Sequence, residues 1–123
     1  MTDWTDPETF ARALDRAETK PKGNNFEAFA EGDRIEHDPG LVLSRHGSED
    51  WLGQTLNHDP AYWRLSAARR RGFEEVPIHP DYLLAATMGC TVPDLSEKGG
   101  YFLGRDDVAF HDPAVVPGTE LAV

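Results

Sequence analysis

The chain has 123 residues, which is the length of a single domain and leaves no room for a second one. Its formal net charge is −10, and this argues against duplex nucleic acid as a partner, because such binding rests on cationic contacts to phosphates. The hydrophobic fraction is only 39%, but aromatic residues are spread along the whole chain, so we expect a folded rather than a disordered protein.

The acidic surface and the single cysteine indicate the setting. Asp (12) outnumbers Glu (10), and Lys (3) is scarce beside Arg (9). A short, hydrated carboxylate surface of this kind keeps proteins soluble in concentrated salt, so we expect an extreme halophile, with an ordinary acidic protein as the alternative. The N-terminus lacks a signal-peptide pattern and Cys90 alone builds no disulfide framework, so we expect the cytoplasm.

Residues 1–25 predict a helix followed by a linker. Thr5 begins a capping box, with Pro7 suited to the first helical position, and this predicts a helix that ends near Thr19. Its apolar residues fall on one stripe, so the helix should dock on another element. The run KPKGNN at 20–25 is typical of a linker.

Between residues 33 and 72 the pattern predicts two short strands and then two consecutive helices. Ser48 is expected to cap the first helix, Asp59-Pro60 to start the second, and Gly72 to end it. The predicted strands cover residues 33–35 and 41–44, with HDPG as the turn between them, and the predicted helices cover residues 50–56 and 60–71.

The stretch VPIHPDYLLAATMGCTVPDL at 76–95 is the segment around which we expect the chain to be organised. Residues 82–90 are small and apolar on nearly every side, which predicts a helix over about 80–91 that is buried all round. Pro80 suits its first position and Pro93 should end it. At about 12 residues it is too short to span a bilayer, so no membrane is expected. A curved antiparallel sheet is the natural wrapper for such a helix.

The last quarter predicts strands. Residues 99–110 have the aromatic and β-branched content of a strand with a bulge near Gly104, and residues 119–123 begin another strand. The sequence stops there in mid-strand, which leaves an unpaired edge. We therefore expect a domain truncated after residue 123: either a fragment of a longer polypeptide, or a sheet that another chain completes.

Four segments carry a resemblance to a known family. They are, in chain order, NNFEAFAEGDRIEH, TLNHDPAYW, GFEEVPIHPDYLL and TVPDLSEKGGYFLGRDDVAFHDPAVVPGTEL. In their order and spacing the chain resembles the MaoC-like hydratases of the hot-dog fold and, within them, the N-terminal part of the mesaconyl-CoA hydratase branch. The resemblance implies an α+β hot-dog fold, with residues 26–123 forming part of that domain.

The resemblance also implies an activity and partners. The reaction is the reversible addition of water to a double bond conjugated to a CoA thioester, here a short branched one such as mesaconyl-CoA. This chemistry needs a base for the water, an acid for the α-carbon and donors for the enolate-like oxygen. No cofactor is expected. The partners are the CoA thioester substrate and either a second copy of the chain or a second hot-dog domain.

The chain departs from the family's GDxNPxH pattern at its chemical positions. Asn57 stands where the aspartate would, and Tyr62 where the histidine would, with Pro60 keeping the frame. An amide exchanges no proton near neutrality, and a phenol with a pKa of about 10 is a poor base. Pro80 replaces a glycine and has no N–H, so the next first-turn amides, of Asp81 and Tyr82, are expected to bind the substrate oxygen.

Two interpretations fit these departures. We favour a catalytically degenerate N-terminal half, in which binding survives and chemistry does not. Alternatively, His79, Asp59 and their neighbours His58 and Asp81 have taken over acid–base duty. A non-catalytic acyl-CoA-binding or structural module is the non-enzymatic alternative.

Other residues allow a functional and a plainer interpretation. Arg70, in the run RRR at 69–71, could bind a CoA phosphate, but cations in the last turn of a helix also oppose its dipole. The aromatic residues Trp51, Tyr62, Trp63 and Phe73 could line an acyl or adenine site, but clusters at helical spacing are more often core.

Histidine beside an acid recurs along the chain, which makes a metal-dependent phosphohydrolase the rival enzyme class. The pairs are His37-Asp38, His58-Asp59 and His111-Asp112, with His79 and Asp81 one residue further apart. Because strand neighbours point to opposite faces and Asp before Pro commonly caps a turn, we expect no metal site.

Overall fold

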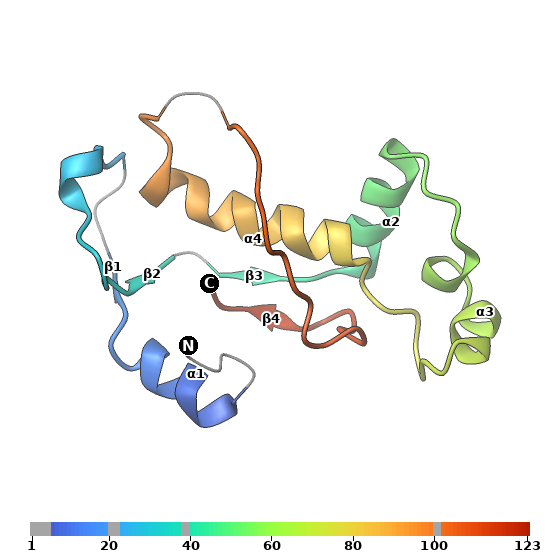
Figure 1. Cartoon of the computed structure of the whole chain (residues 1–123). Helices are drawn as coiled ribbons and strands as arrows, with labels where there is room; N and C mark the ends of the chain where they lie inside the picture. Colours follow the sequence, from blue (N-terminus) through green and yellow to red (C-terminus); the bar gives the residue numbers. More distant parts are fainter. Residues whose placement is uncertain (1–5, 20–22, 38–39, 100–101) are drawn as a thin grey trace.

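The computed structural model describes residues 6–19, 23–37, 40–99 and 102–123, and these form a mixed helix and sheet structure compatible with the α+β class (Figure 1). The helices are α1 (Pro7–Leu14), α2 (Arg45–Gln54), α3 (Leu65–Arg70) and α4 (Pro80–Leu95), with the 3-10 turns η1 (Phe26–Ala28) and η2 (Pro60–Tyr62). The strands are β1 (Glu18–Thr19), β2 (Ile35–Glu36), β3 (Leu41–Val42) and β4 (Glu120–Leu121).

Two short ladders hold the strands. β1 pairs parallel with β2, and β3 pairs antiparallel with β4, with Leu41 opposite Leu121. The Leu43 N–H donates to the carbonyl of Thr119 at 2.9 Å, and the His37 N–H donates to the carbonyl of Val123 at 2.8 Å. The expected strand at 119–123 therefore finds its partner in residues 37 and 41–43, although its regular part is shorter than expected.

The long helix α4 runs through the middle of the molecule (Figure 1). It has 16 residues and continues through Pro93, so the expectation that this proline ends the helix was wrong. A proline removes one ladder hydrogen bond, and Gly89, whose carbonyl loses that partner, is exposed where water can replace it. The helix therefore tolerates Pro93 and ends at Ser96.

The expectation that α4 is buried all round was also wrong. Residues 82–90 are half-buried apart from the exposed Gly89, and Asp94 is the buried residue of this helix. A helix of this length is about 24 Å long at 1.5 Å per residue, and strands of two residues each cannot enclose it. The described ladders do not wrap α4, so the hot-dog architecture remains a proposal.

The core lies mainly near the start of α4, beneath α2, η2 and α3. Its fully buried apolar residues include Leu43, Leu52, Ala61 and Ala68, each at most 1% exposed. Val76 and Ile78 extend it to the start of α4. This is the part of the molecule that fixes the residues discussed below.

The two helices before α4 differ from their predicted bounds. Ser44, and not Ser48, caps α2, because its hydroxyl accepts the Gly47 N–H at 2.9 Å. The predicted helix over 60–71 is split into η2 and α3 at Arg64, whose backbone is extended (φ −131°, ψ 128°). Gly72 follows α3 with φ +92°, a conformation that glycine adopts freely, so it ends the helix as predicted.

The outer segments also differ from expectation. α1 begins at Pro7 as predicted but ends at Leu14, because Glu18–Thr19 leave the helix to pair with β2. Its cap is Asp6, whose carboxylate accepts the Thr9 N–H at 2.9 Å. Thr5, Lys20-Pro21-Lys22 of the predicted linker, and Asp38-Pro39 of the predicted turn lie outside the described residues.

The predicted strand over 99–110 is absent from its described residues, 99 and 102–110. This segment instead crosses α4 as an extended chain (Figure 1), and the Arg105 guanidinium contacts the sulfur of Met88 at 2.6 Å. No strand lies beside it among the described residues, so its aromatic and β-branched side chains have no ladder to join. Phe102 and Leu103 are accordingly exposed.

None of the described helices has both the length and the apolar character needed to cross a membrane.

Candidate functional site

His79 occupies the start of α4 and is the centre of a polar cluster. It is the N-cap of the helix, with Pro80 at the first helical position, and it is only 8% exposed. Its Nδ1 accepts the backbone N–H of Asp81 at 3.1 Å, and its own backbone N–H donates to the Ser48 hydroxyl at 3.4 Å. The adjacent Ile78 N–H donates to the carbonyl of Val115 at 2.7 Å, which fixes the approach to the helix.

Asn57 meets the other side of the His79 ring. The Asn57 Nδ2 lies 3.0 Å from the His79 Nε2, and the Asn57 Oδ1 accepts the Asp59 N–H at 3.0 Å. The preceding residue, Leu56, has φ +55°, a left-handed conformation that costs a non-glycine residue on the order of 1 kcal/mol. This turn directs the Asn57 side chain back to the start of α4.

The hydrogen-bond roles in this cluster cannot all be satisfied at once. A neutral imidazole offers one donor and one acceptor. Here both ring nitrogens of His79 face donors, the Asn57 amide nitrogen on one side and the Asp81 N–H on the other. Turning the Asn57 amide over would only move the conflict to the Asp59 N–H. The cluster therefore holds one N–H donor more than its own acceptors can serve.

Tyr62 packs on the same ring. Its ring centroid lies 4.4 Å from that of His79 in an edge-on arrangement at 61°. Burial raises the pKa of Tyr62, and the negative charge of Asp59 adds to this effect. The phenol therefore stays protonated near neutrality and can donate a hydrogen bond, but it is no base.

Asp59 is held away from the ring by its own partners. Its carboxylate accepts from the Arg71 guanidinium at 2.7 Å and caps η2 through the Ala61 N–H at 3.1 Å. The hydrogen bond from Arg71 is the main cause that lowers the pKa of Asp59 below its ordinary value of 3.8. Asp59 is thus an ionised carboxylate already engaged with a cation.

Of the two backbone amides predicted to bind the substrate oxygen at the start of α4, that of Asp81 has a partner within the chain, whereas for Tyr82 the structure shows where the side chain packs. The Asp81 amide, which was expected to be free, donates to His79, and its carboxylate is 67% exposed with an oxygen 3.9 Å from the His79 Nδ1. The Tyr82 side chain packs against α2: its ring centroid lies 6.5 Å from that of Trp51, and a Cβ on Gly47 would overlap its hydroxyl.

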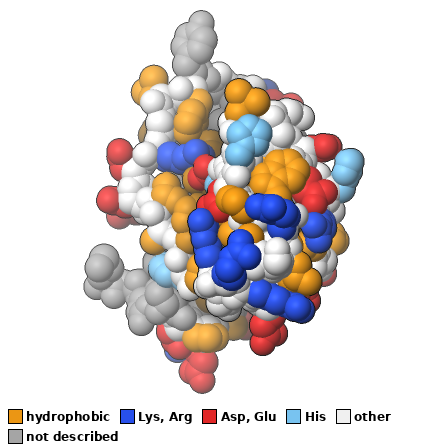
Figure 2. Space-filling view, turned by 90° about the vertical axis from the view of Figure 1, so that its right-hand side faces the viewer, with side chains coloured by type: hydrophobic (Ala, Val, Ile, Leu, Met, Phe, Trp, Pro, Cys, Tyr) orange, Lys and Arg blue, Asp and Glu red, His pale blue; other side chains and the backbone are white. Residues whose placement is uncertain are grey.

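Arg70 lies at the end of α3 on an exposed face that is rich in arginine (Figure 2). Its neighbour Arg71 pairs with Asp59, so the RRR run reaches the His79 cluster through Arg71 and not through Arg70. Sequence reasoning named Trp63 as a possible lining residue but missed that its indole donates to the carbonyl of Asn57 at 2.9 Å. It also missed the pairing of Arg71 with Asp59 and the contact of the Ser48 hydroxyl with the His79 N–H.

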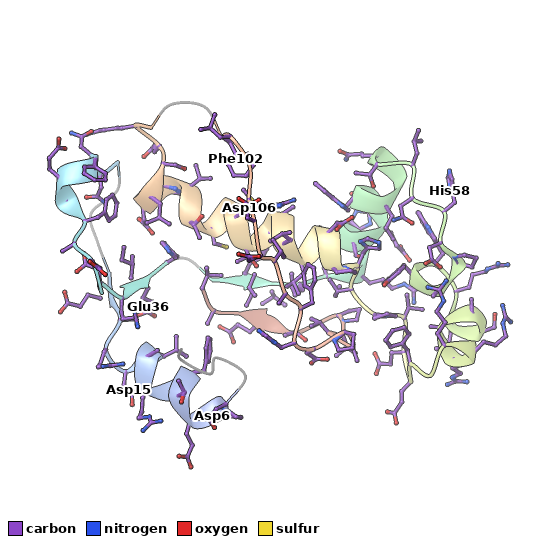
Figure 3. The ribbon with its side chains drawn as sticks, viewed as in Figure 1. Asp6, Asp15, Glu36, His58, Phe102 and Asp106 are labelled. Atoms are coloured by element: carbon purple, nitrogen blue, oxygen red, sulfur yellow. The ribbon has the colours of Figure 1, made fainter. Side chains whose placement is uncertain are left out.

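The remaining histidines do not gather. His58 points outward from the end of the molecule that carries α2 and α3 (Figure 3), and His37 pairs with Asp94 at 2.7 Å. Among the described residues, no three His, Cys, Asp or Glu side chains come close enough to hold a metal ion. The described part of the chain therefore gives no support to a metal-dependent phosphohydrolase.

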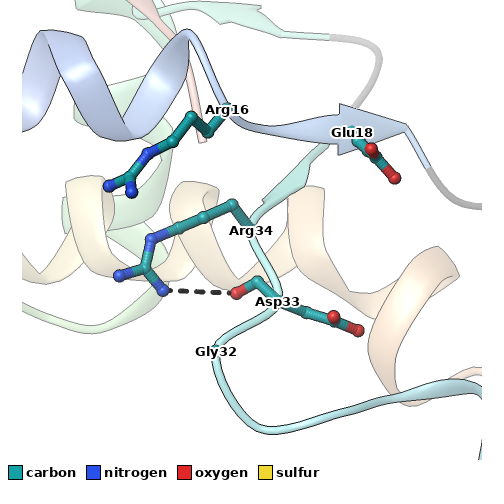
Figure 4. Close-up of a pocket in the computed structure, with 5 residues that line it drawn as sticks. All are labelled: Arg16, Glu18, Gly32, Asp33 and Arg34. Carbon is teal, nitrogen blue, oxygen red and sulfur yellow. Dashed lines mark hydrogen bonds between the residues drawn. The ribbon is translucent and has the colours of Figure 1, made fainter.

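Three hollows lie elsewhere on the surface of the described residues. A polar hollow of about 260 Å³ lies between α1 and β2, where the guanidinium groups of Arg16 and Arg34 point the same way and the carboxylates of Glu18 and Asp33 point away from them (Figure 4). An apolar hollow of about 410 Å³ is lined by α1, α4 and the end of the chain, including Val123. A third, of about 370 Å³, lies beside Trp63 and His58.

The family model and the curated relatives that match this chain carry the same description. The sequence model of a family described as mesaconyl-CoA hydratase matches residues 3–123. Two curated relatives carry that name: one from Haloarcula hispanica is 68% identical, and one from Haloarcula marismortui is 66% identical, in each case over 131 aligned positions. The alignments cover all of this chain but only 36% of each relative. No solved structure matches.

Proposed function

The chain belongs to the mesaconyl-CoA hydratase family, and from this premise we propose that it is part of a hydro-lyase that adds water to, or removes it from, a short branched enoyl-CoA thioester such as mesaconyl-CoA. The observation that carries the proposal is the match along nearly the whole chain, residues 3–123, together with relatives of the same name at 66% and 68% identity. The activity is proposed for the whole protein, since this chain spans about a third of its relatives' length.

Within that protein we assign this chain the binding role. Hydration places a hydroxyl on the β-carbon and a proton on the α-carbon of the enoyl thioester, and it needs a base to take a proton from water. Among the described candidates, Asn57 is an amide, Tyr62 is a protonated phenol and Asp59 is paired with Arg71. Both ring nitrogens of His79 already face N–H donors, the Asp81 carboxylate is exposed to solvent, and His58 points outward (Figure 3). This supports the catalytically degenerate half over the alternative in which these residues took over the chemistry.

The surplus N–H donor at His79 supports the binding of an oxygen acceptor from the substrate. The contacts among Asn57, His79 and Asp81 leave one N–H group without an acceptor. An oxygen atom of a ligand at the start of α4 would accept a hydrogen bond from that group. The first turn of a helix favours such an oxygen further, because its amides lie at the positive end of the dipole. A thioester carbonyl or an enolate-like oxygen has this chemistry.

The finer features belong to the same proposal. We take residues 26–123 as part of a hot-dog domain, preceded by the helix and linker of 1–25, with its sheet completed by further strands from the same protein or a second copy. The half-buried face of α4 is the surface that such strands would cover. The setting we propose is the cytoplasm of a halophile, in keeping with the acidic composition and the Haloarcula relatives.

A second candidate function is an acyl-CoA-binding or structural module without turnover. The observation that favours it is that Asp59 is paired with Arg71 and both ring nitrogens of His79 face N–H donors. It differs from the first candidate in one respect: the whole protein, and not only this chain, would be inactive.

The test follows the absorbance of the enoyl thioester during incubation of mesaconyl-CoA with the native full-length protein and, separately, with residues 1–123. We expect loss of absorbance with the native protein and none with the isolated chain. Turnover by the chain alone would contradict the binding role, and inactivity of the native protein would leave the second candidate.

A further inference from the structure

A short segment of this acidic protein has the opposite charge. Residues 60–73 contain four arginines and neither Asp nor Glu, although the whole chain has a net charge of −10. The segment forms η2 and α3, and its exposed arginines gather on one face of the molecule (Figure 2). Arg45 of α2 joins the same face, because its guanidinium donates to the carbonyl of Trp63 at 3.3 Å.

Not all of these arginines have an ion-pair partner. Arg45 pairs with Glu49 and Arg71 with Asp59, each at 2.7 Å. Among the ion pairs of the described residues, none involves the other three, which we call the arginine face: Arg64, Arg69 and Arg70.

The helix dipole accounts for only part of the arginine face. Arg69 and Arg70 lie in the last turn of α3, where cations are favourable. Arg64 is the N-cap of the same helix, and the positive end of the dipole disfavours a cation there. Its side chain makes no capping hydrogen bond. The dipole of this short helix therefore does not account for Arg64.

An apolar hollow lies beside the arginine face. It has a volume of about 370 Å³ and is lined by Gly53, His58, Pro60, Trp63 and Arg64. The Trp63 indole is held in place by its hydrogen bond to the carbonyl of Asn57 at 2.9 Å. Since the Asn57 side chain contacts His79, one residue joins the wall of this hollow to the polar cluster.

We propose that the arginine face and the Trp63 hollow bind the phosphorylated nucleotide end of a CoA thioester, so that the 3′-phosphate contributes to affinity. This inference rests on the proposed function for the identity of the ligand. A fixed indole beside guanidinium groups offers a stacking surface and phosphate donors together. In concentrated salt the screening length falls to about 3 Å, so phosphate must be bound by direct hydrogen bonds, for which guanidinium is well suited.

The first test compares ligands on the unsubstituted native protein by isothermal titration calorimetry. The probes are CoA, dephospho-CoA, which lacks the 3′-phosphate, and pantetheine, which lacks the nucleotide. We expect CoA to bind roughly tenfold more tightly than dephospho-CoA, and pantetheine to bind more weakly still. Equal affinities for CoA and dephospho-CoA would overturn the inference.

The second test locates the contact. Arg64→Gln, and the double variant Arg69→Gln/Arg70→Gln, should each weaken CoA binding by roughly tenfold and leave pantetheine binding unchanged. Arg12→Gln is the matched control, because Arg12 is exposed on α1 and, among the described residues, its side chain bonds to its own helix, through the Glu8 carbonyl and the Thr9 hydroxyl. A loss as large in the control as in the face variants would contradict the site.

Turnover of mesaconyl-CoA, measured on the same preparations, separates the two proposals. Hydration with no preference for the 3′-phosphate would overturn this inference and keep the proposed function. CoA binding that depends on the 3′-phosphate, without hydration of mesaconyl-CoA, would keep this inference and overturn the proposed function. If both hold, the face variants should raise KM and leave kcat unchanged, because none of these arginines contacts the His79 ring.

Discussion

The two ends of α4 are organised in different ways. At its start, α2, η2 and α3 pack closely, with Leu52 and Ala68 fully buried, and they hold Asn57 and Tyr62 against His79. At its end, α1 and the strand pair β1–β2 leave Phe10 48% exposed beside an apolar hollow of about 410 Å³. The polar cluster therefore depends mainly on contacts made within residues 44–82, together with the hydrogen bond from Ile78 to Val115, whereas the other end offers apolar surface for further structure.

One buried contact between a histidine and an aspartate holds the looser end. The His37 Nδ1 and the Asp94 Oδ2 are 2.7 Å apart, and Asp94 is fully buried. The same turn of α4 accepts the Gly23 N–H on the carbonyl of Pro93 at 2.7 Å and the Asn24 side chain on the carbonyl of Asp94 at 3.1 Å. The structure around the end of α4 is thus held by a few polar contacts, whereas the structure around its start is held by apolar packing.

The largest expected effect comes from breaking that pair. Asp94→Ala should lower the free energy of unfolding by about 3–5 kcal/mol, because it leaves a buried group without its partner. Chemical denaturation of the native protein measures the loss. Adding His37→Ala should cost less than the sum of the two single changes. If Asp94→Ala costs under about 1 kcal/mol, the contact does not hold this end.

The packed end is tested at Gly47. A Cβ there would overlap the Tyr82 hydroxyl, so Gly47→Ala should destabilise the protein by about 2 kcal/mol in thermal unfolding. Tyr82→Phe removes the hydroxyl and should restore much of that loss. Gly53→Ala is the matched control: it lies in the same helix with no atom within 4 Å of its new Cβ, and it should be neutral or slightly stabilising. Equal losses at both glycines would show that the Tyr82 contact is unimportant.

The polar cluster is tested at Asn57. Asn57→Asp would supply the acceptor that His79 lacks: the carboxylate could accept both the Asp59 N–H and a His79 Nε2–H, while Nδ1 keeps the Asp81 N–H. We expect a gain of about 1 kcal/mol in stability. Nitrogen-15 NMR of the ring should show His79 protonated at Nε2. A ring protonated at Nδ1 in the variant would contradict this account of the cluster.

The smallest effect concerns pH at Asp59. Its pKa is lowered by Arg71, so its contribution to stability is present above the ordinary value of 3.8 and is lost as the pH falls through the lower folded value. Asp59→Asn should therefore destabilise the protein near neutrality, and the difference from the unsubstituted protein should shrink as the pH falls below about 3.8. Unfolding measured from pH 2 to 7 checks this. A difference that is constant across the range would show that Asp59 is not paired through its charge.

Sequence reasoning worked where the signals were local. Pro7, Pro80 and Gly72 were correctly placed at helix ends, because a missing N–H or a positive φ restricts the backbone wherever it occurs. The family was also recognised, since its segments keep their order. The prediction at Pro93 failed because a single lost hydrogen bond can be left to water at an exposed Gly89.

The rest depended on contacts between distant residues. The burial of residues 82–90 was inferred from their composition, but burial is decided by what lies opposite, and the described strands are too short to cover α4. In the same way, sequence reasoning placed Asn57, Tyr62 and His79 at motif positions, but not the pairing of Asp59 with Arg71, twelve residues away. That pairing is what removes Asp59 from the candidate bases.

The central claim is that the His79 cluster binds the thioester and does not carry out the chemistry. It is tested most directly by steady-state kinetics of His79→Gln in the native full-length protein with mesaconyl-CoA, alongside CoA titration. The account predicts that KM rises by roughly tenfold while kcat stays within about threefold of the unsubstituted value. Loss of turnover with unchanged affinity for CoA would contradict it and would make His79 a catalytic residue.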